Sequence, residues 1–76
     1  MNAPQTIADG LALAAERDAL VVKLEARWRW LGENPGHPKY REREDLALED
    51  LGVYELMEDA LRAGAANQFG GAVEWV

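Results

Sequence analysis

The sequence predicts an all-α fold, an antiparallel helical hairpin, on the strength of three observations. Two segments of equal length are rich in good helix formers and repeat their apolar residues at helical spacing. A short segment with two prolines separates them. The chain has 76 residues, enough for one small domain and too few for a second hydrophobic core. Two equal helices joined by a short turn fold back on each other, which gives the hairpin.

The first helix is predicted over residues 7–31, after a flexible arm of residues 1–6. Thr6 can act as its N-cap, and Asp9 stands three residues later, at the second position of a capping box. At 100° per residue, the large apolar side chains of this segment share a sector about 100° wide. They are Leu13, Leu20, Val21, Leu24, Trp28 and Leu31.

The turn is predicted over residues 32–37, with Gly32 as the left-handed residue that ends the first helix. Asn34 and His37 each precede a proline, which disfavours helical backbone angles there. The second helix is predicted over residues 38–63, starting at or near Pro38. Its apolar stripe contains Leu46, Val53, Met57 and Ala60.

Two glycines bear on the continuity and the end of the second helix. Gly52 allows either one continuous second helix or two helices that divide at this residue. Gly64 is a good helix terminator, so residues 64–76 are predicted to form a short extended tail.

A lone hairpin buries only the seam between its helices, and 76 residues cost on the order of 100 kcal/mol of conformational entropy to order. The chain has no cysteine for a disulfide. Association is the common remedy, so we expect self-association into a helical bundle, with a homodimer as the first expectation. The residues expected at the interface are Leu13, Leu20, Leu24, Trp28, Leu31, Leu46, Val53 and Met57.

Two tryptophans sharpen this expectation because one core cannot hold both. Trp28 and Trp30 are two positions apart, so on a helix they point about 200° apart. Trp28 lies in the apolar stripe, and Trp30 lies nearly opposite, beside a face of alanines. Trp30 is left exposed unless the helix ends early, the tail with Phe69 and Trp75 folds over it, or another chain covers it.

Composition excludes several classes of function. The chain carries 8 Lys+Arg and 14 Asp+Glu, a net charge of −6, which argues against direct binding of nucleic acid or of anionic membranes. No apolar run approaches the ~20 residues of a transmembrane span, and no signal peptide is recognisable, so we expect a cytoplasmic protein. Charge is uneven: residues 1–43 sum to +1 and residues 44–76 to −7.

The function predicted first is non-catalytic, a small interaction or assembly subunit with no cofactor. The candidates for contact with a different partner are Trp30, Trp75, Glu55 and Asp59. No metal site is predicted. His37 is the only histidine and is expected to be a loop or cap residue, and the carboxylates of Glu55 and Asp59 are expected to be part of a solvated acidic face.

Two alternatives remain open. A row of carboxylates on the second helix can imitate a phosphate backbone, which predicts an acidic inhibitor that occupies a basic site on another protein. More remotely, the cations can form an enzyme pocket for a dicarboxylate, with Gln68 as a donor. In this distribution of cations along helices the chain resembles helical chorismate mutases, without sharing a specific motif. The cations concerned are Arg17, Lys23, Arg27, Lys39 and Arg43. A salt bridge between subunits is the simpler explanation for Arg17, which lies in the apolar stripe.

Overall fold

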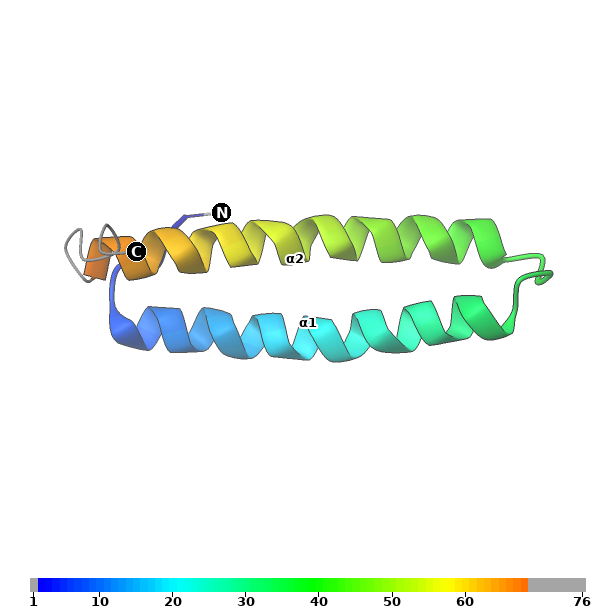
Figure 1. The fold of residues 1–76 in the computed structure, drawn as a ribbon, viewed down its shortest axis with the longest axis horizontal. Coiled ribbons are helices and arrows are strands. Elements are labelled where there is room, and N and C mark those ends of the chain that lie inside the picture. The colour runs from blue at the N-terminus through cyan, green and yellow to red at the C-terminus, as the bar shows by residue number, and fades with distance from the viewer. Residues whose placement is uncertain (1, 69–76) are drawn as a thin grey trace.

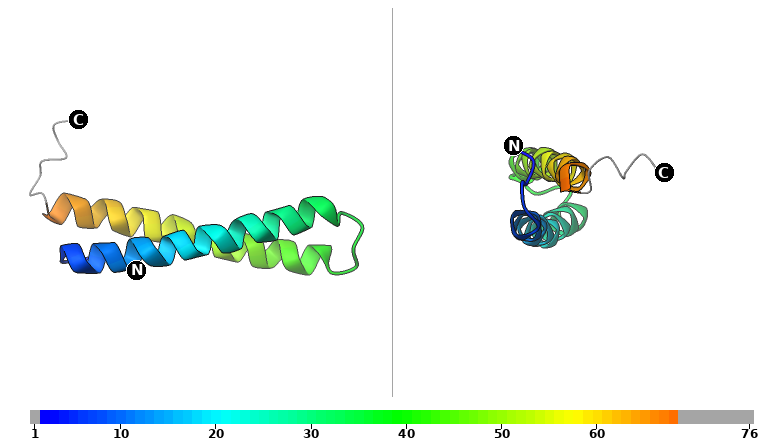
Figure 2. Two further views of the ribbon diagram at one scale, coloured as in Figure 1. Left: turned by 90° about the horizontal axis from the view of Figure 1, so that it is seen from below. Right: turned by 90° about the vertical axis from the view of Figure 1, so that its left-hand side faces the viewer.

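The computed structural model describes residues 2–68, which form two long antiparallel helices (Figure 1). Helix α1 spans Ile7–Glu33 and helix α2 spans Tyr40–Gln68. The hairpin measures 50 × 23 × 17 Å, and its helices cross near their middles (Figure 2). The predicted all-α hairpin is therefore confirmed. The tail predicted from residue 69 onward lies outside the described residues.

The start of α1 follows the prediction. Thr6 is its N-cap, with extended backbone angles of φ −129° and ψ 163°, and its Oγ1 accepts a hydrogen bond from the backbone N–H of Asp9 at 3.0 Å. A side-chain acceptor at this position satisfies one of the backbone donors that the first turn leaves free. The cap thus fixes where the arm ends and the helix begins.

The end of α1 differs from the prediction. Gly32 is helical and does not adopt the left-handed conformation, and the helix continues to Glu33. Asn34 caps it instead: its backbone N–H donates to the carbonyl of Leu31 at 3.4 Å, and its side-chain Nδ2 donates to the carbonyl of Trp30 at 2.9 Å. Since Pro35 follows, Asn34 cannot continue the helix. The proline, rather than the glycine, ends α1.

The turn closes through local hydrogen bonds. The N–H of His37 donates to the carbonyl of Asn34 at 3.1 Å, and the N–H of Tyr40 donates to the carbonyl of His37 at 3.0 Å. The ring Nδ1 of His37 accepts from the N–H of Lys39 at 3.0 Å, so His37 is a loop and cap residue, as expected. Helix α2 therefore begins at Tyr40, two residues after Pro38.

Helix α2 is continuous through both of its glycines. It passes Gly52 without a break, which decides between the two alternatives, and it passes Gly64 and reaches Gln68. Gly64 was predicted to end the helix, and this prediction is wrong because the residue has a different role. A Cβ at Gly64 would collide with the Cγ of Pro4 and lie 2.7 Å from its Cδ, so the glycine makes room for the buried Pro4 of the arm.

The core is small. Among the residues whose burial the structure describes, the helices bury five hydrophobic side chains, in addition to Pro4 of the arm, namely Leu24, Leu31, Ala47, Met57 and Ala60. Leu24 and Leu31 are seven residues apart in α1, and half-buried Tyr54 follows Ala47 by seven in α2. A seven-residue repeat is typical of two helices that wrap around each other in a left-handed coil. Since only one seam exists, each helix has one covered side.

Candidate functional site

Charged residues occupy places in the seam where a coiled coil would have apolar ones. Arg17 lies seven residues before Leu24, and its Nη1 donates to Oε1 of Glu58 in the other helix at 3.0 Å. Hydrogen bonds to Glu58 and to Asp18 raise the pKa of Arg17 above its ordinary value, so the guanidinium stays charged. The expected salt bridge between subunits is therefore unnecessary, because Arg17 finds its partner within its own chain.

Asp50 is the second polar point of the seam. Its Oδ2 lies 2.8 Å from Nε of Arg27 and 3.9 Å from Nζ of Lys23. The two closer atoms are buried and make no hydrogen bond, so their contact is ionic. Charged pairs within a seam fix the register of the two helices, because sliding one helix by a turn would leave each charge without its partner.

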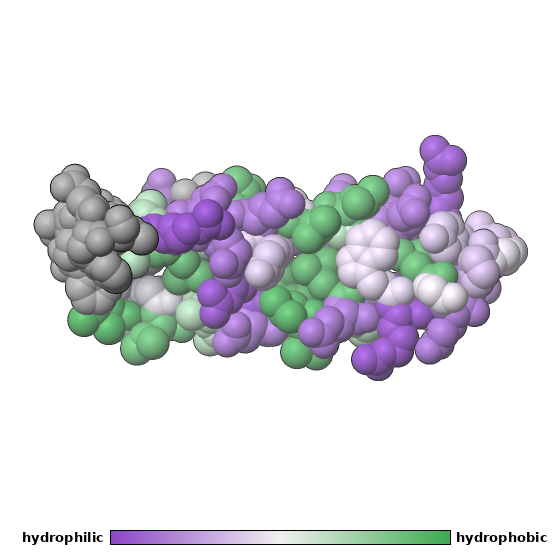
Figure 3. All heavy atoms as spheres, viewed as in Figure 1, coloured by the Kyte–Doolittle hydropathy of each residue, from purple (hydrophilic) through white to green (hydrophobic). Residues whose placement is uncertain are grey.

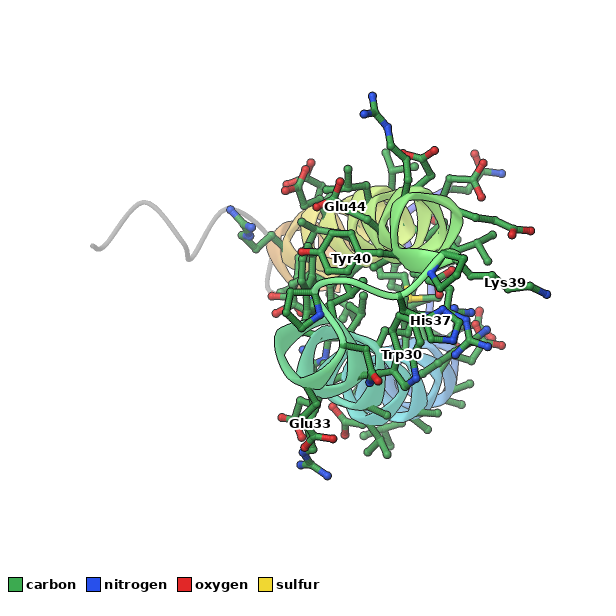
Figure 4. All side chains as sticks on the ribbon, turned by 90° about the vertical axis from the view of Figure 1, so that its right-hand side faces the viewer. Trp30, Glu33, His37, Lys39, Tyr40 and Glu44 are labelled. Carbon is green, nitrogen blue, oxygen red and sulfur yellow. The ribbon has the colours of Figure 1, made fainter. Side chains whose placement is uncertain are left out.

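Trp30 is half-buried by contacts with the turn and with the start of α2, contrary to the sequence-based expectation. The guanidinium carbon of Arg43 lies 4.2 Å from the indole centroid, and the ring of His37 meets it edge-on at 5.0 Å. Figure 4 shows Trp30 and His37 on one side of the hairpin and Tyr40 on the other. None of the three explanations considered for Trp30 is needed, because the chain returns across this flank directly after α1 ends.

Two grooves run beside the seam. Because Trp28 and Trp30 point about 200° apart, they line different grooves on opposite flanks. The Trp30 groove has a volume of about 300 Å³ and is lined by Lys23, Ala26, Arg27, Trp30, Arg43 and Leu46. The Trp28 groove has a volume of about 520 Å³ and is lined by Val21, Leu24, Glu25, Trp28, Arg29, Leu51 and Tyr54.

The Trp28 groove is the more exposed apolar feature. Its indole remains 41% exposed although Trp28 belongs to the apolar stripe of α1. Eight large apolar residues of the described chain are at least 40% exposed, and the most exposed are 68% accessible. They are Ile7, Leu11, Val22, Trp28, Leu46, Leu48, Val53 and Leu56. Of these, Trp28 lines the Trp28 groove, Leu46 lines the Trp30 groove, and the others lie elsewhere on the hairpin. On the face drawn in Figure 3, hydrophobic side chains gather along the boundary between the helices. Such a surface is suited to covering by another protein surface.

An acidic hollow adjoins the Trp28 groove. It is lined by Tyr54, Glu55, Glu58, Asp59 and Arg62. Tyr54 lines both cavities, so the hollow begins where the groove ends. Within the hollow, Oδ1 of Asp59 lies 3.5 Å from Nη2 of Arg62, and among residues 2–68 no three potential ligands come together to hold a metal ion.

The five cations of the remote enzyme hypothesis do not share one pocket. Lys23, Arg27 and Arg43 converge on the Trp30 groove, but Asp50 engages two of them and the Trp30 indole engages the third. Arg17 pairs with Glu58 in the other half of the hairpin, and Lys39 is exposed in the turn. Gln68 is the last residue of α2, at the opposite end from this groove.

The expected interface residues divide into two groups. Leu24, Leu31 and Met57 are buried in the hairpin seam, and Leu13 and Leu20 are half-buried along it. The exposed members are Trp28, Leu46 and Val53. Among the partner-contact candidates, Trp30 is half-buried, Glu55 and Asp59 are exposed, and Trp75 lies outside the described residues.

Sequence reasoning did not single out several residues of these cavities, of which three matter most here. Arg29 and Leu51 line the Trp28 groove, and Tyr54 joins that groove to the acidic hollow. Leu51 is outside the apolar stripe predicted for the second helix. A signal was present, since Leu51 and Glu58 are seven residues apart and therefore lie on the same flank of α2, but assigning one apolar stripe to each helix leaves this flank out.

Comparison with known protein families, with curated proteins and with solved structures gave no match. Neither α1 nor α2 combines the length and apolarity that a bilayer span requires.

Proposed function

We propose that this protein is a non-catalytic assembly subunit of the cytoplasm that acts by self-association, with a homodimer of hairpins as the smallest unit. The observation that carries the proposal is the contrast between five buried apolar residues and eight large apolar residues left at least 40% exposed. Among the residues whose burial the structure describes, nothing larger than methionine or leucine is buried, and Ala47, which is 0% exposed, has only a methyl side chain. A second hairpin supplies the missing half of a four-helix core.

The dimensions of the hairpin support this proposal. One long face, 50 × 23 Å, has a projected area on the order of 1,000 Å², and a standard interface buries about 800 Å² on each partner. The Trp28 groove is the leading surface on such a face, because it is the larger groove and has an exposed indole. Buried aromatic anchors dominate the energetics of many interfaces.

Sedimentation equilibrium of the full chain tests the proposal. We expect a dimer or larger species at micromolar concentration. Replacing Trp28 with Ala removes the anchor and should weaken association by at least tenfold, since such anchors contribute about 2 kcal/mol or more. Val22→Ala is the matched control, because Val22 is more exposed and lines neither groove. A chain that remains monomeric at 100 micromolar while melting cooperatively would contradict the proposal.

A second candidate function rests on the outer face of α2. Glu42, Asp45 and Glu49 are exposed, spaced by three and four residues, and outside the ion pairs found among residues 2–68. This spacing sets three carboxylates along one side of a helix. Such a row supports the acidic-inhibitor alternative, in which the helix occupies a basic site on another protein. Salt-sensitive capture of a nucleic-acid-binding protein, lost when all three are changed to Lys, tests it.

A further inference from the structure

We propose that two hairpins associate antiparallel through the Trp28 groove, so that Arg29 of each copy meets Glu55 of the other. This inference rests on the proposed self-association and adds the partner surface and its orientation. It starts from the distribution of charge along the hairpin. The turn end, residues 27–43, carries five cations and two acids, a net of +3. The open end, residues 7–19 and 54–68, carries six acids and two cations, a net of −4.

Opposite charge at the two ends favours one orientation. In a parallel pair, positive turns lie together and acidic ends lie together, which raises the electrostatic free energy of the dimer. In an antiparallel pair, each positive turn lies on the acidic half of the other copy. The antiparallel pair has a two-fold axis perpendicular to the long axis, which is compatible with the two-fold symmetry that most homodimers have.

Both halves of the proposed contact lie on one face. Arg29 lines the Trp28 groove, Glu55 lines the acidic hollow, and Tyr54 belongs to both cavities. Neither Arg29 nor Glu55 takes part in the ion pairs formed within the described part of the chain. Both side chains are exposed, so each is available to a second copy.

The helix register gives the level of the two-fold axis along the hairpin. The pairs Arg17–Glu58 and Arg27–Asp50 show which residues lie side by side in the two antiparallel helices. A residue of α1 lies beside the residue of α2 for which the two residue numbers add to about 76. Arg29 therefore lies beside residue 47, about 12 Å along the axis from Glu55 at 1.5 Å per residue. The midpoint is at the level of Leu51 in α2 and of Glu25 in α1, and both residues line the groove. A two-fold axis there places Leu51, Glu25 and the nearby Trp28 of the two copies around the axis, with the Arg29–Glu55 contacts on either side.

The opposite flank is less suited to a second copy. Its open end is covered by the arm, where residues 2–5 form a hollow with Ala12 and Glu16 of α1. Its cations are also engaged, since Arg27 is paired with Asp50 and Arg43 stacks on Trp30. In the Trp28 groove, by contrast, Arg29 takes part in no ion pair among residues 2–68. It is therefore available to a carboxylate of a second copy.

Charge reversal tests the contact. We expect Arg29→Glu and Glu55→Arg each to weaken the dimer on the order of tenfold, because two ion pairs become two like-charge contacts. An equimolar mixture of the two variants should regain the affinity of the original chain, since each contact in the mixed dimer again joins opposite charges. Arg41→Glu and Glu33→Arg are matched controls, because both residues are exposed and line none of the cavities described.

Orientation is measured independently with a spin label. The chain has no cysteine, so Gly36→Cys gives one label in the exposed turn. In an antiparallel dimer the two labels lie at opposite ends, at a distance comparable to the 50 Å length of the hairpin. In a parallel dimer they lie within about 20 Å, or two interhelical spacings.

The outcomes separate the inference from the proposed function. A dimer with the long distance and with recovery in the mixture supports the antiparallel contact. A dimer with the short distance, or one indifferent to both charge reversals, overturns the orientation and leaves self-association standing. A chain that stays monomeric in sedimentation overturns both.

Discussion

Gly64 and Gly52 form a matched pair that tests how the arm docks. Both are interior residues of α2, and Gly→Ala in a helix interior stabilises by about 0.5–1 kcal/mol. A Cβ at Gly52 meets nothing within 4 Å, so Gly52→Ala should show this gain in full. The same change at Gly64 forces the ring of Pro4 away, since its Cδ would lie 2.7 Å and its carbonyl oxygen 3.1 Å from the new carbon.

Displacing the arm costs the burial of the Pro4 ring, about 1–2 kcal/mol at 25 cal/mol per Å². That loss offsets or exceeds the helix-propensity gain, so Gly64→Ala should be neutral or destabilising by up to about 1 kcal/mol. Thermal melts followed by circular dichroism resolve this, because 1 kcal/mol shifts the Tm of a domain this size by about 4–8 °C. The two alanine variants should differ in Tm by several degrees.

A double-mutant cycle assigns the difference to the arm. In a Pro4→Ala background most of the colliding ring is gone, so Gly64→Ala should approach the effect of Gly52→Ala. If Gly64→Ala stabilises the original chain as much as Gly52→Ala does, then Pro4 does not pack on α2 and the reasoning is refuted.

Two further predictions concern the polar contacts of the hairpin. Asp50→Asn leaves Lys23 and Arg27 without their shared carboxylate and should lower the free energy of unfolding, measured in urea, by about 1–2 kcal/mol. The control Glu49→Gln, at an exposed position, should change the free energy of unfolding by less than about 0.5 kcal/mol. Equal effects of the two substitutions would contradict a structural role for the seam carboxylate. Arg43→Ala removes the cation above Trp30 and should lower the free energy of unfolding by about 0.5–1 kcal/mol. Arg41→Ala is the control. If Arg43→Ala lowers the stability no more than Arg41→Ala does, the stacking on Trp30 contributes nothing measurable.

Local signals in the sequence predicted the fold well. The N-cap at Thr6 needs only a hydroxyl at the right spacing, and the turn needs only two prolines, so both were predictable from a few neighbouring residues. The end of α1 was misjudged by two residues because Gly32 and Asn34 are both plausible caps, and the choice depends on hydrogen bonds that Asn34 makes.

The candidate site was predicted less well. A single apolar stripe per helix identified Trp28 but assigned Trp30 to an uncovered face, because a helical projection ignores where the chain goes next. Arg29 and Tyr54 gained their significance from α1 and α2 lying side by side, which places a groove and an acidic hollow next to each other.

Residue spacing and composition by themselves determined that this chain forms two helices and that these turn back on each other. They also determined that some apolar side chains remain exposed outside the seam between the helices. These properties follow from interactions between residues a few positions apart and from the small size of the chain. Only the tertiary structure decided that Gly64 receives Pro4, that Arg17 and Asp50 are neutralised across the seam, and that Trp30 is covered by the turn. The first two depend on residues far apart in the chain coming into contact, and the packing of the two helices sets those distances. The third depends on the direction in which the chain leaves α1, which brings His37 and Arg43 onto the indole.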